Sequence, residues 1–305
     1  MMELREKGGG KGMAGFKLGV ITDEISQDIE DAIRIAKDYG LEGLELRSVE
    51  GKQLHRLSGQ RVNEIAARIH DAGLRVCGLS TPVFKCNLGN VEETAAHHRM
   101  LRRYAELARQ FSAPYIRGFS FWADGDWEAA FPRIVRELEL VVPVMEEFGT
   151  TFVVEADPSV NATNGEKVAA LVRSVSSPHV RALYDPGNDL WDPAGERPYP
   201  DGYEALRGLM VHMHAKDAVR GPERTDAVAI GRGQVGYSDL LDRLVADGYE
   251  GWLVVETHYR LASALSEEQL KRPSGYAFSG GGEAATRECL DSLFELLKPD
   301  RLGIS

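Results

Sequence analysis

The chain has 305 residues, 43% of them hydrophobic, which is enough to bury one large core. Its formal net charge of −11 argues against a phosphate-backbone partner, because no strong local basic patch offsets the repulsion. No apolar run is long enough to span a bilayer. The three cysteines form no CxxC pair, so neither a disulfide framework nor a structural zinc site is indicated.

The first residues carry charges and glycines and lack the apolar stretch of a secretory signal. We therefore expect a disordered tail over residues 1–15, a single barrel domain over 16–298 and a short C-terminal tail over 299–305. Three cysteines without a pairing pattern are typical of a reducing compartment, so we expect a cytoplasmic protein.

Eight short apolar runs alternate with amphipathic helical patterns along the whole chain. A repeat of roughly 30 residues that alternates strand and helix predicts βαβ units with parallel strands. Eight such units predict a closed (β/α)8 barrel, the TIM barrel. A doubly wound sheet is the alternative, but it usually carries a Gly-rich turn after its first strand, where this chain has ITDEIS. The expected strands are 17–22, 43–48, 74–80, 114–121, 151–156, 180–185, 209–217 and 251–257.

Each of the last four expected strands carries a potential metal ligand at its exit. The runs FVVE, ALYD, MVHMH and LVVE end at Glu155, Asp185, His214 and Glu256. Each residue alone has an ordinary explanation, but the carboxyl ends of barrel strands meet at one face, so we expect the four to converge. Three carboxylates and one imidazole suit Mn²⁺, Mg²⁺ or Co²⁺ better than Zn²⁺. We expect one divalent ion. Mn²⁺ is the first choice, and Mg²⁺, Co²⁺ and Zn²⁺ are the alternatives.

Two residues flank His214 on the same strand. His212 precedes it by two positions and points the same way, so we expect it in a deeper layer of the barrel. Lys216 follows at the rim, where it either contacts a substrate oxygen or is a solvated charge. The sequence does not decide between these two roles for Lys216.

Polar side chains inside the second and fourth expected strands need partners in the barrel. Glu45 is a candidate for the active-site mouth and for substrate binding. Arg47 and Arg117 are explained equally well by ion pairs between strands. Residues 258–283 form a connection longer than usual, which is either a lid, an oligomer contact or an ordinary flexible loop before the last helix.

Several longer motifs carry a resemblance to a known superfamily: VVEADPSVNATNGE, ALYDPGN, VHMHAKDA, IGRGQVGYSDLL and GWLVVETH. From about residue 16 to 298, the chain resembles the sugar isomerase/epimerase superfamily with the xylose isomerase-like TIM barrel. This superfamily includes ketose 3-epimerases, inosose dehydratase and type-IV endonucleases. The resemblance implies that Glu155, Asp185, His214 and Glu256 bind one divalent ion and that Glu155 and Glu256 also act as acid and base on opposite faces of a sugar.

The chain departs from the ketose epimerases at two substrate-contacting positions. Asn188 stands where many of them have His, and Asn161 stands where they have Glu. We keep both as candidate substrate-binding residues, although a simple ketohexose pocket is then in doubt. The endonuclease branch needs additional histidines for a trinuclear zinc cluster, and Asn188 replaces one of them.

The expected function is a divalent-metal-dependent sugar or keto-sugar isomerase or epimerase that works through a metal-stabilised enediolate. A lyase or dehydratase on a keto-inositol or 3-keto-glycoside would use the same site. A non-catalytic sugar-binding barrel or partner subunit is the alternative of another class. We expect a small-molecule substrate and neither nucleic acid nor membrane as partner; because relatives are often dimers or tetramers, a homo-oligomer stays open.

Overall fold

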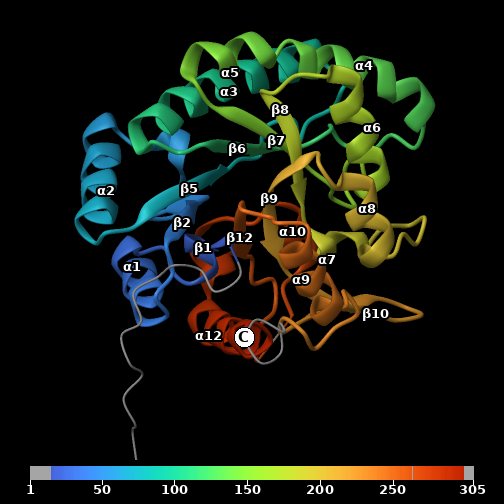
Figure 1. The fold of residues 1–305 in the computed structure, drawn as a ribbon. Helices are drawn as coiled ribbons and strands as arrows, with labels where there is room; N and C mark the ends of the chain where they lie inside the picture. Colours follow the sequence, from blue (N-terminus) through green and yellow to red (C-terminus); the bar gives the residue numbers. More distant parts are fainter. Residues whose placement is uncertain (1–14, 263, 299–305) are drawn as a thin grey trace, which may run out of the picture.

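Eight parallel strands close into a barrel in this computed structural model, which describes residues 15–262 and 264–298 (Figure 1). The strand order around the barrel follows the order along the chain, with β12 pairing back onto β1. The predicted (β/α)8 barrel is confirmed. Residues 1–14 and 299–305 of the two expected tails lie outside the described residues. The barrel strands are β1 (Lys17–Ile21), β2 (Gly43–Leu46), β5 (Arg75–Ser80), β6 (Tyr115–Gly118), β7 (Thr151–Glu155), β8 (Val180–Tyr184), β9 (Met210–Ala215) and β12 (Trp252–Val255).

The barrel strands are apolar because helices cover one face and the barrel interior the other. Every residue of β12 and all but the first of β7 are buried. All eight expected strands were longer than those observed, and the excess is largest at β6, which ends at Gly118. The residues just beyond the strand ends are apolar or buried because the loops pack closely over the barrel. A buried loop and a buried strand have similar amino-acid compositions, so the sequence does not show where the strand ends.

The outer layer consists of helices that connect consecutive strands (Figure 1). The side-chain oxygens of Asn90 and Asn164 accept hydrogen bonds from backbone N–H groups at the starts of α3 and α6. The longer helices are α1 (Ile29–Asp38), α2 (Gly59–Asp71), α3 (Val91–Phe111), α4 (Trp127–Glu139), α5 (Val142–Phe148), α6 (Gly165–Val175), α9 (Tyr237–Ala246) and α12 (Gly282–Leu296).

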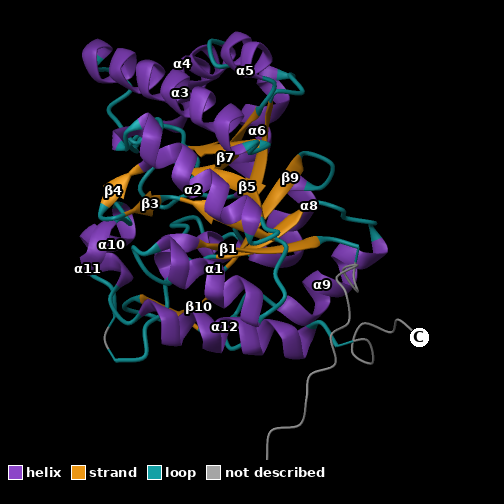
Figure 2. Cartoon of the chain, turned by 90° about the vertical axis from the view of Figure 1, so that its left-hand side faces the viewer, coloured by secondary structure: helices purple, strands orange, loops and turns teal. Residues whose placement is uncertain are grey.

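Short elements gather where the barrel strands end. The β3–β4 hairpin (Ser48–Val49 and Lys52–Gln53) follows β2, and the β10–β11 hairpin (Asp217–Arg220 and Thr225–Val228) follows β9. Figure 2 shows α10 and α11 on the same side of the barrel as the β3–β4 hairpin. The other short helices are η1 (Thr22–Glu24), η2 (Leu54–Arg56), α7 (Pro186–Asp189), η3 (Pro198–Gly202), α8 (Tyr203–Leu206), α10 (Glu267–Lys271) and α11 (Gly275–Ser279).

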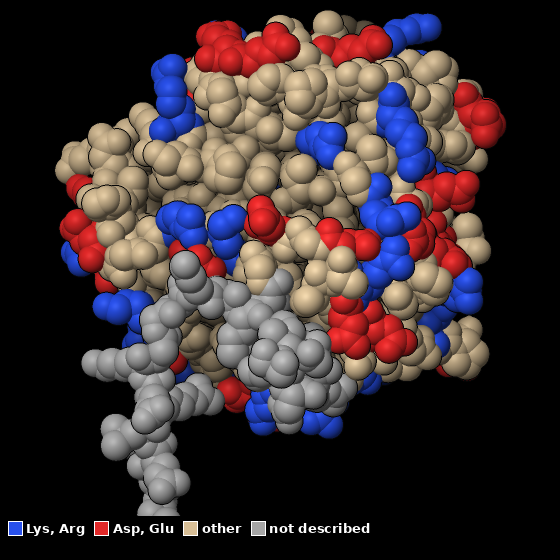
Figure 3. All heavy atoms as spheres, viewed as in Figure 1, with Lys and Arg blue, Asp and Glu red and all other residues tan. Residues whose placement is uncertain are grey.

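The surface carries charges of both signs. Figure 3 shows acidic and basic side chains interspersed over the face in view. The three cysteines are buried and free, as expected. Within the described part of the chain, no helix combines the length and the apolar character needed to cross a membrane.

Candidate metal centre

The four predicted ligands converge at the carboxyl ends of β7, β8, β9 and β12. One ligand atom from each of Glu155, Asp185, His214 and Glu256 lies within 4.8 Å of the others. All four side chains are buried, with at most 2% of their surface exposed. Each comes from the end of its own strand, and closure of the barrel makes these strands neighbours. The sequence-based prediction of convergence is confirmed.

The spacing of these atoms suits a divalent ion. His214 Nδ1 lies 3.0 Å from Glu155 Oε1, 3.5 Å from Glu256 Oε2 and 3.9 Å from Asp185 Oδ2. Ligands bound at about 2.1 Å are about 3.0 Å apart at right angles and about 4.2 Å apart when opposite each other. The three distances fall inside this range. The donor set, rich in carboxylate oxygen, is the one that hard divalent cations prefer.

Two buried arginines hold the two glutamates. Arg117 Nη1 donates to Glu155 Oε2 at 2.6 Å, and Arg47 Nη1 donates to Glu256 Oε1 at 2.8 Å. Arg117 lies on β6 and Arg47 directly follows β2, so both pairs join different strands. The ion-pair explanation that the sequence left open therefore applies to both arginines.

The pKa values follow from burial and from these partners. Burial alone would raise the pKa of Glu155, but Arg117 and His214 outweigh it and lower the pKa to about 2. Lys216 and His258 likewise hold the pKa of Glu256 well below its usual range against burial. Asp185 behaves differently: burial, together with the neighbouring glutamates, raises its pKa to about 7 despite Lys216. The centre therefore holds more negative charge than its cations compensate.

A charge count of the connected ion pairs makes this excess explicit. The charge network contains six buried carboxylates and four buried permanent cations. Protons supply the difference: despite burial, Glu45 and Glu155 raise the pKa of His214 well above its usual range, and burial raises the pKa of Asp185 to about 7. A divalent ion would take the place of those protons. The carboxylates are Asp23, Glu24, Glu45, Glu155, Asp185 and Glu256, and the cations are Arg47, Arg117, Lys216 and Arg260.

Lys216 and Asn188, two of the predicted substrate-binding residues, lie beside the ligands. Lys216 Nζ is 2.6 Å from Asp185 Oδ2 and 2.8 Å from Glu256 Oε2, and its side chain is buried. Lys216 is therefore an internal counter-charge and not a solvated rim residue. Asn188 follows Asp185 in the short helix α7, and its Nδ2 donates to Ala156 O at 2.8 Å.

The other two predicted substrate-binding residues are tied to the protein. Asn161 Nδ2 lies within 3.0–3.2 Å of three backbone carbonyl oxygens of the loop after β6. Glu45 is buried in the barrel, where its carboxylate accepts from His212 Nε2 at 2.6 Å and lies 3.2 Å from His214 Nε2. His212 lies in a deeper layer than His214, as expected.

Four titratable residues of the centre were not identified from the sequence as site residues. Asp23 and Glu24 follow β1 and bind Arg47, and Arg260 Nη2 lies 3.5 Å from Glu24 Oε2. His258 Nε2 lies 3.4 Å from Glu256 Oε1. The exit of the first strand carries the same pattern as the four ligands, a carboxylate after an apolar run, and that pattern predicts Asp23 and Glu24.

Glu24, Glu256 and His258 also have ligand atoms within 4.8 Å of one another. The Arg47 guanidinium already binds both of these carboxylates, at 2.7 Å to Glu24 and 2.8 Å to Glu256. A divalent ion there would lie against that guanidinium, and the two positive charges would repel each other. This contact favours the first group as the ion site.

The segment after β12 is fastened across the mouth. We call residues 258–262 and 264–281 the mouth segment. Lys85 Nζ, on the loop after β5, donates to Lys271 O at 3.0 Å, and Gly275 N donates to Ser48 Oγ at 3.3 Å. The Phe278 ring lies 4.7 Å from the guanidinium carbon of Arg47. These contacts argue against an ordinary flexible loop and agree with a segment that covers the mouth.

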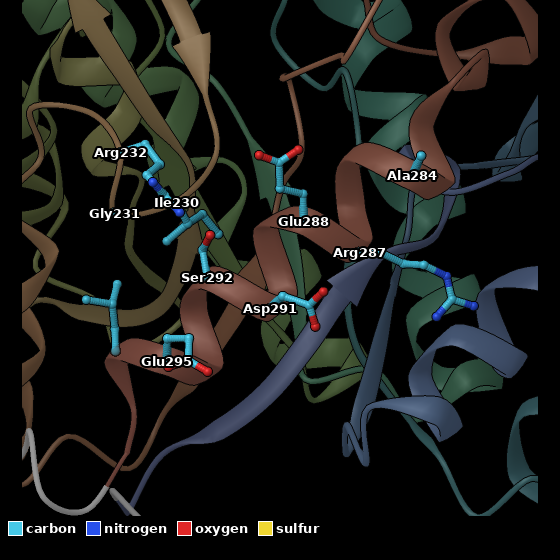
Figure 4. Close-up of a pocket in the computed structure, with 10 residues that line it drawn as sticks. Ile230, Gly231, Arg232, Ala284, Arg287, Glu288, Asp291, Ser292 and Glu295 are labelled. Atoms are coloured by element: carbon cyan, nitrogen blue, oxygen red, sulfur yellow. The ribbon is translucent and has the colours of Figure 1, made fainter. Parts of the chain in front are cut away.

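A separate hollow of about 500 Å³ lies on the outer helical layer, between residues 230–232 and α12 (Figure 4). Arg232 and Arg287 line it together with Glu288, Asp291 and Glu295. None of the four ligand residues lines this hollow. The buried metal centre and this surface hollow are distinct features.

Solved structures with the same fold include several epimerase-like barrels. D-psicose 3-epimerase from Clostridium cellulolyticum H10, solved with D-tagatose, is 17% identical with a TM-score of 0.70, covering 92% of this chain and 98% of its own. The IOLI protein with a bound zinc atom is 15% identical, with a TM-score of 0.72 and the same coverage. A xylose isomerase-like TIM barrel protein from Mycobacterium smegmatis, solved with magnesium, is 16% identical, with a TM-score of 0.67 over 95% of this chain and all of that one.

At these identities, the structural similarity establishes the fold alone. No curated protein matches the sequence. A family model described as "Xylose isomerase-like TIM barrel" matches residues 33–278, well over half of the chain. The chain therefore belongs to the xylose isomerase-like TIM barrel family.

Proposed function

We propose that this protein is a divalent-metal-dependent isomerase or epimerase of a sugar or keto-sugar. The observation that carries the proposal is the convergence of Glu155, Asp185, His214 and Glu256 in a network whose buried carboxylates outnumber its permanent cations. The family match and the sugar epimerase among the structural neighbours support the substrate class. Mn²⁺ is our first choice of ion; the magnesium and zinc in the neighbours support those metals as alternatives.

The ion, when bound, supplies a Lewis acid that stabilises negative charge on adjacent substrate oxygens. The remaining chemistry is proton transfer at carbon, for which we assign Glu155 and Glu256. Their depressed pKa values keep both as carboxylates, the form that accepts a proton. Arg117 and Arg47 hold one oxygen of each. In epimerisation, one glutamate removes a proton from one face, and the other, after taking up a proton from solvent, delivers it to the opposite face.

Two of the substrate-binding assignments gain support from position. Lys216 and Asn188 lie beside the ligands, where an ammonium and an amide can bind substrate oxygens. Asn161 and Glu45 remain assignments by resemblance and by strand position, since their polar atoms bind protein groups.

The decisive experiment is solvent deuterium exchange. Protein loaded with Mn²⁺ is incubated in D₂O with a panel of ketoses and keto-sugars, and incorporation at carbon is followed by NMR and mass spectrometry. We expect exchange that EDTA abolishes and added Mn²⁺ restores. Glu155→Gln and Glu256→Gln are each expected to lower the rate by about 10²–10⁴-fold. No exchange with any sugar by metal-loaded protein would refute the proposal.

A lyase or dehydratase is the second candidate. It is favoured by Asn161 and Asn188, whose amides are tied to backbone carbonyls and replace the side chains that contact substrate in the ketose epimerases. The same proton abstraction followed by loss of a β-leaving group changes the substrate mass. A product of unchanged mass identifies the isomerase or epimerase, and loss of water or an alcohol identifies the lyase. If both glutamine variants retain the biological activity, a non-catalytic sugar-binding role replaces both.

A further inference from the structure

A chain of three buried side chains lies directly beneath the metal centre. His214 turns Nδ1 toward Glu155, Asp185 and Glu256, and its other ring nitrogen, Nε2, lies 3.2 Å from Glu45 Oε1. The second oxygen of Glu45 lies 2.6 Å from His212 Nε2. The order inward from the ligands is therefore His214, Glu45 and His212.

The separations in this chain are those of hydrogen bonds and not of metal ligands. Glu45, His212 and His214 offer ligand atoms within 4.8 Å of one another. Two atoms bound to one ion at about 2.1 Å are about 3.0 Å apart at the closest common angle. The 2.6 Å between Glu45 and His212 is shorter than that. A proton therefore lies between these two residues, and Glu45 is a hydrogen-bond acceptor.

Several contacts hold the Glu45 carboxylate in place beside His214. Ser80 Oγ donates to the same oxygen that faces His214. Gly78 leaves the room that the carboxylate occupies, since a Cβ there would lie 3.2 Å from Glu45 Cδ and Oε2. The side chain is 1% exposed. A substrate contact would require all of these bonds to break.

Each ring nitrogen of His214 faces a carboxylate: Nδ1 lies 3.0 Å from Glu155 Oε1 and Nε2 lies 3.2 Å from Glu45 Oε1. A neutral imidazole has one N–H and one lone pair. An ion held by Glu155, Asp185 and Glu256 would take the lone pair of Nδ1, and the proton would then lie on Nε2, where Glu45 accepts it. A carboxylate acceptor also makes the imidazole a stronger ligand.

We propose that Glu45 is a positioning residue that fixes the tautomer and ring orientation of His214 for metal binding. His212 in turn holds the far oxygen of Glu45. This role rests on the proposed metal dependence, and it replaces direct substrate binding by Glu45. Both histidines lie on β9 and Glu45 lies on β2, so the three side chains also link two strands that do not pair.

The first test is metal affinity, measured for Mn²⁺ by isothermal titration calorimetry on the full-length protein. We expect Glu45→Gln to weaken binding by about 10–100-fold. An amide has one oxygen and cannot accept from both His212 and His214. Asp192→Asn is the matched control, because Asp192 is a buried carboxylate that accepts from Thr163 and Asn164 outside the charge network. Its affinity is expected to change by less than about twofold.

A second pair of variants guards against misfolding of the first. His212→Leu removes the donor to Glu45, whereas His212→Gln keeps an N–H at a similar distance. We expect weakened Mn²⁺ binding in the leucine variant and recovery toward wild type in the glutamine variant. Circular dichroism in EDTA verifies that each variant is folded.

The tautomer provides a readout that a purely structural role would not move. Protein with ¹⁵N-labelled histidine is loaded with Zn²⁺, and the ring nitrogens are assigned by NMR. Wild type is expected to carry the His214 proton on Nε2, and Glu45→Gln to lose that single form. If wild type binds the ion and Glu45→Gln binds it equally with the same tautomer, this inference is overturned while the metal dependence stands. Wild type that binds no divalent ion overturns both.

Discussion

The two halves of the barrel contribute to the centre in different ways. The last four strands, β7, β8, β9 and β12, supply all four predicted ligands. The first four strands and the residues directly after them supply the partners of those ligands: Asp23, Glu24, Glu45, Arg47, Ser80 and Arg117. One half supplies the groups that we propose as ligands, and the other half supplies the side chains that pair with them.

The largest change is expected from loss of a ligand in the second half. Asp185→Asn should weaken Mn²⁺ binding by more than about 100-fold, beyond the range typical of outer partners. It also removes a buried carboxylate whose charged form burial disfavours, so the variant should have a higher Tm than wild type in EDTA. Calorimetry and thermal melting measure the two effects. A lower Tm than wild type in EDTA would contradict the view that the Asp185 charge destabilises the protein without an ion.

A partner from the first half should act mainly on stability. Arg117→Met leaves the buried Glu155 without its guanidinium, a loss that typically costs about 3–5 kcal/mol. The cost should be smaller with Mn²⁺ present, because the ion compensates the same carboxylate. Urea unfolding with EDTA and with Mn²⁺ tests this difference. Equal destabilisation under both conditions would show that Arg117 does not stabilise the same carboxylate charge as the ion.

Lys216 should affect affinity and rate in opposite directions. Its ammonium competes with an ion for Asp185 Oδ2 and Glu256 Oε2. Lys216→Met is therefore expected to tighten Mn²⁺ binding by about tenfold, a difference of about 1.4 kcal/mol. The deuterium-exchange rate should fall, because the group that binds a substrate oxygen is lost. Weaker ion binding in this variant would show that the ammonium supports the ligands and does not compete for them.

The smallest effect is expected at Lys85 and Asp157, a buried pair that is balanced by itself. Lys85 Nζ is 2.7 Å from Asp157 Oδ2, and neither residue contacts the four ligands. Replacing both partners of such a pair is often close to neutral. The double variant Lys85→Met/Asp157→Asn should bind Mn²⁺ within about twofold of wild type, as calorimetry would measure. A tenfold change in Mn²⁺ affinity would show that the loop after β5 also influences the four ligands.

The ligand half could be predicted from sequence because its information is local. An apolar run that ends in Glu, Asp or His places that side chain at the mouth of any parallel barrel, and the four such exits did converge. The partner half depends on which strands become neighbours and on their register. Arg47 and Arg117 were left between two roles, because the choice depends on Glu256 and Glu155, each more than thirty residues away in sequence.

Two polar residues show why resemblance does not replace geometry. Asn161 and Asn188 align with substrate-contacting positions, yet each amide nitrogen donates to backbone carbonyls. Asp23 and Glu24 also follow the apolar run of a strand. Their segment was used only to show that no Gly-rich turn follows the first strand. A rule that reads every strand exit in the same way would have included them.

The contact between Phe278 and Arg47 connects the mouth segment to Glu256. Phe278 stacks on Arg47, Arg47 holds Glu256, and the ligands are too deeply buried for a sugar to reach without displacement of a covering segment. Displacement of the mouth segment to admit a substrate would therefore also remove the aromatic neighbour of Arg47. The rate of that opening would be an upper limit on the turnover number of the proposed reaction. Hydrogen exchange at the amides of α11, compared with that turnover number, tests this.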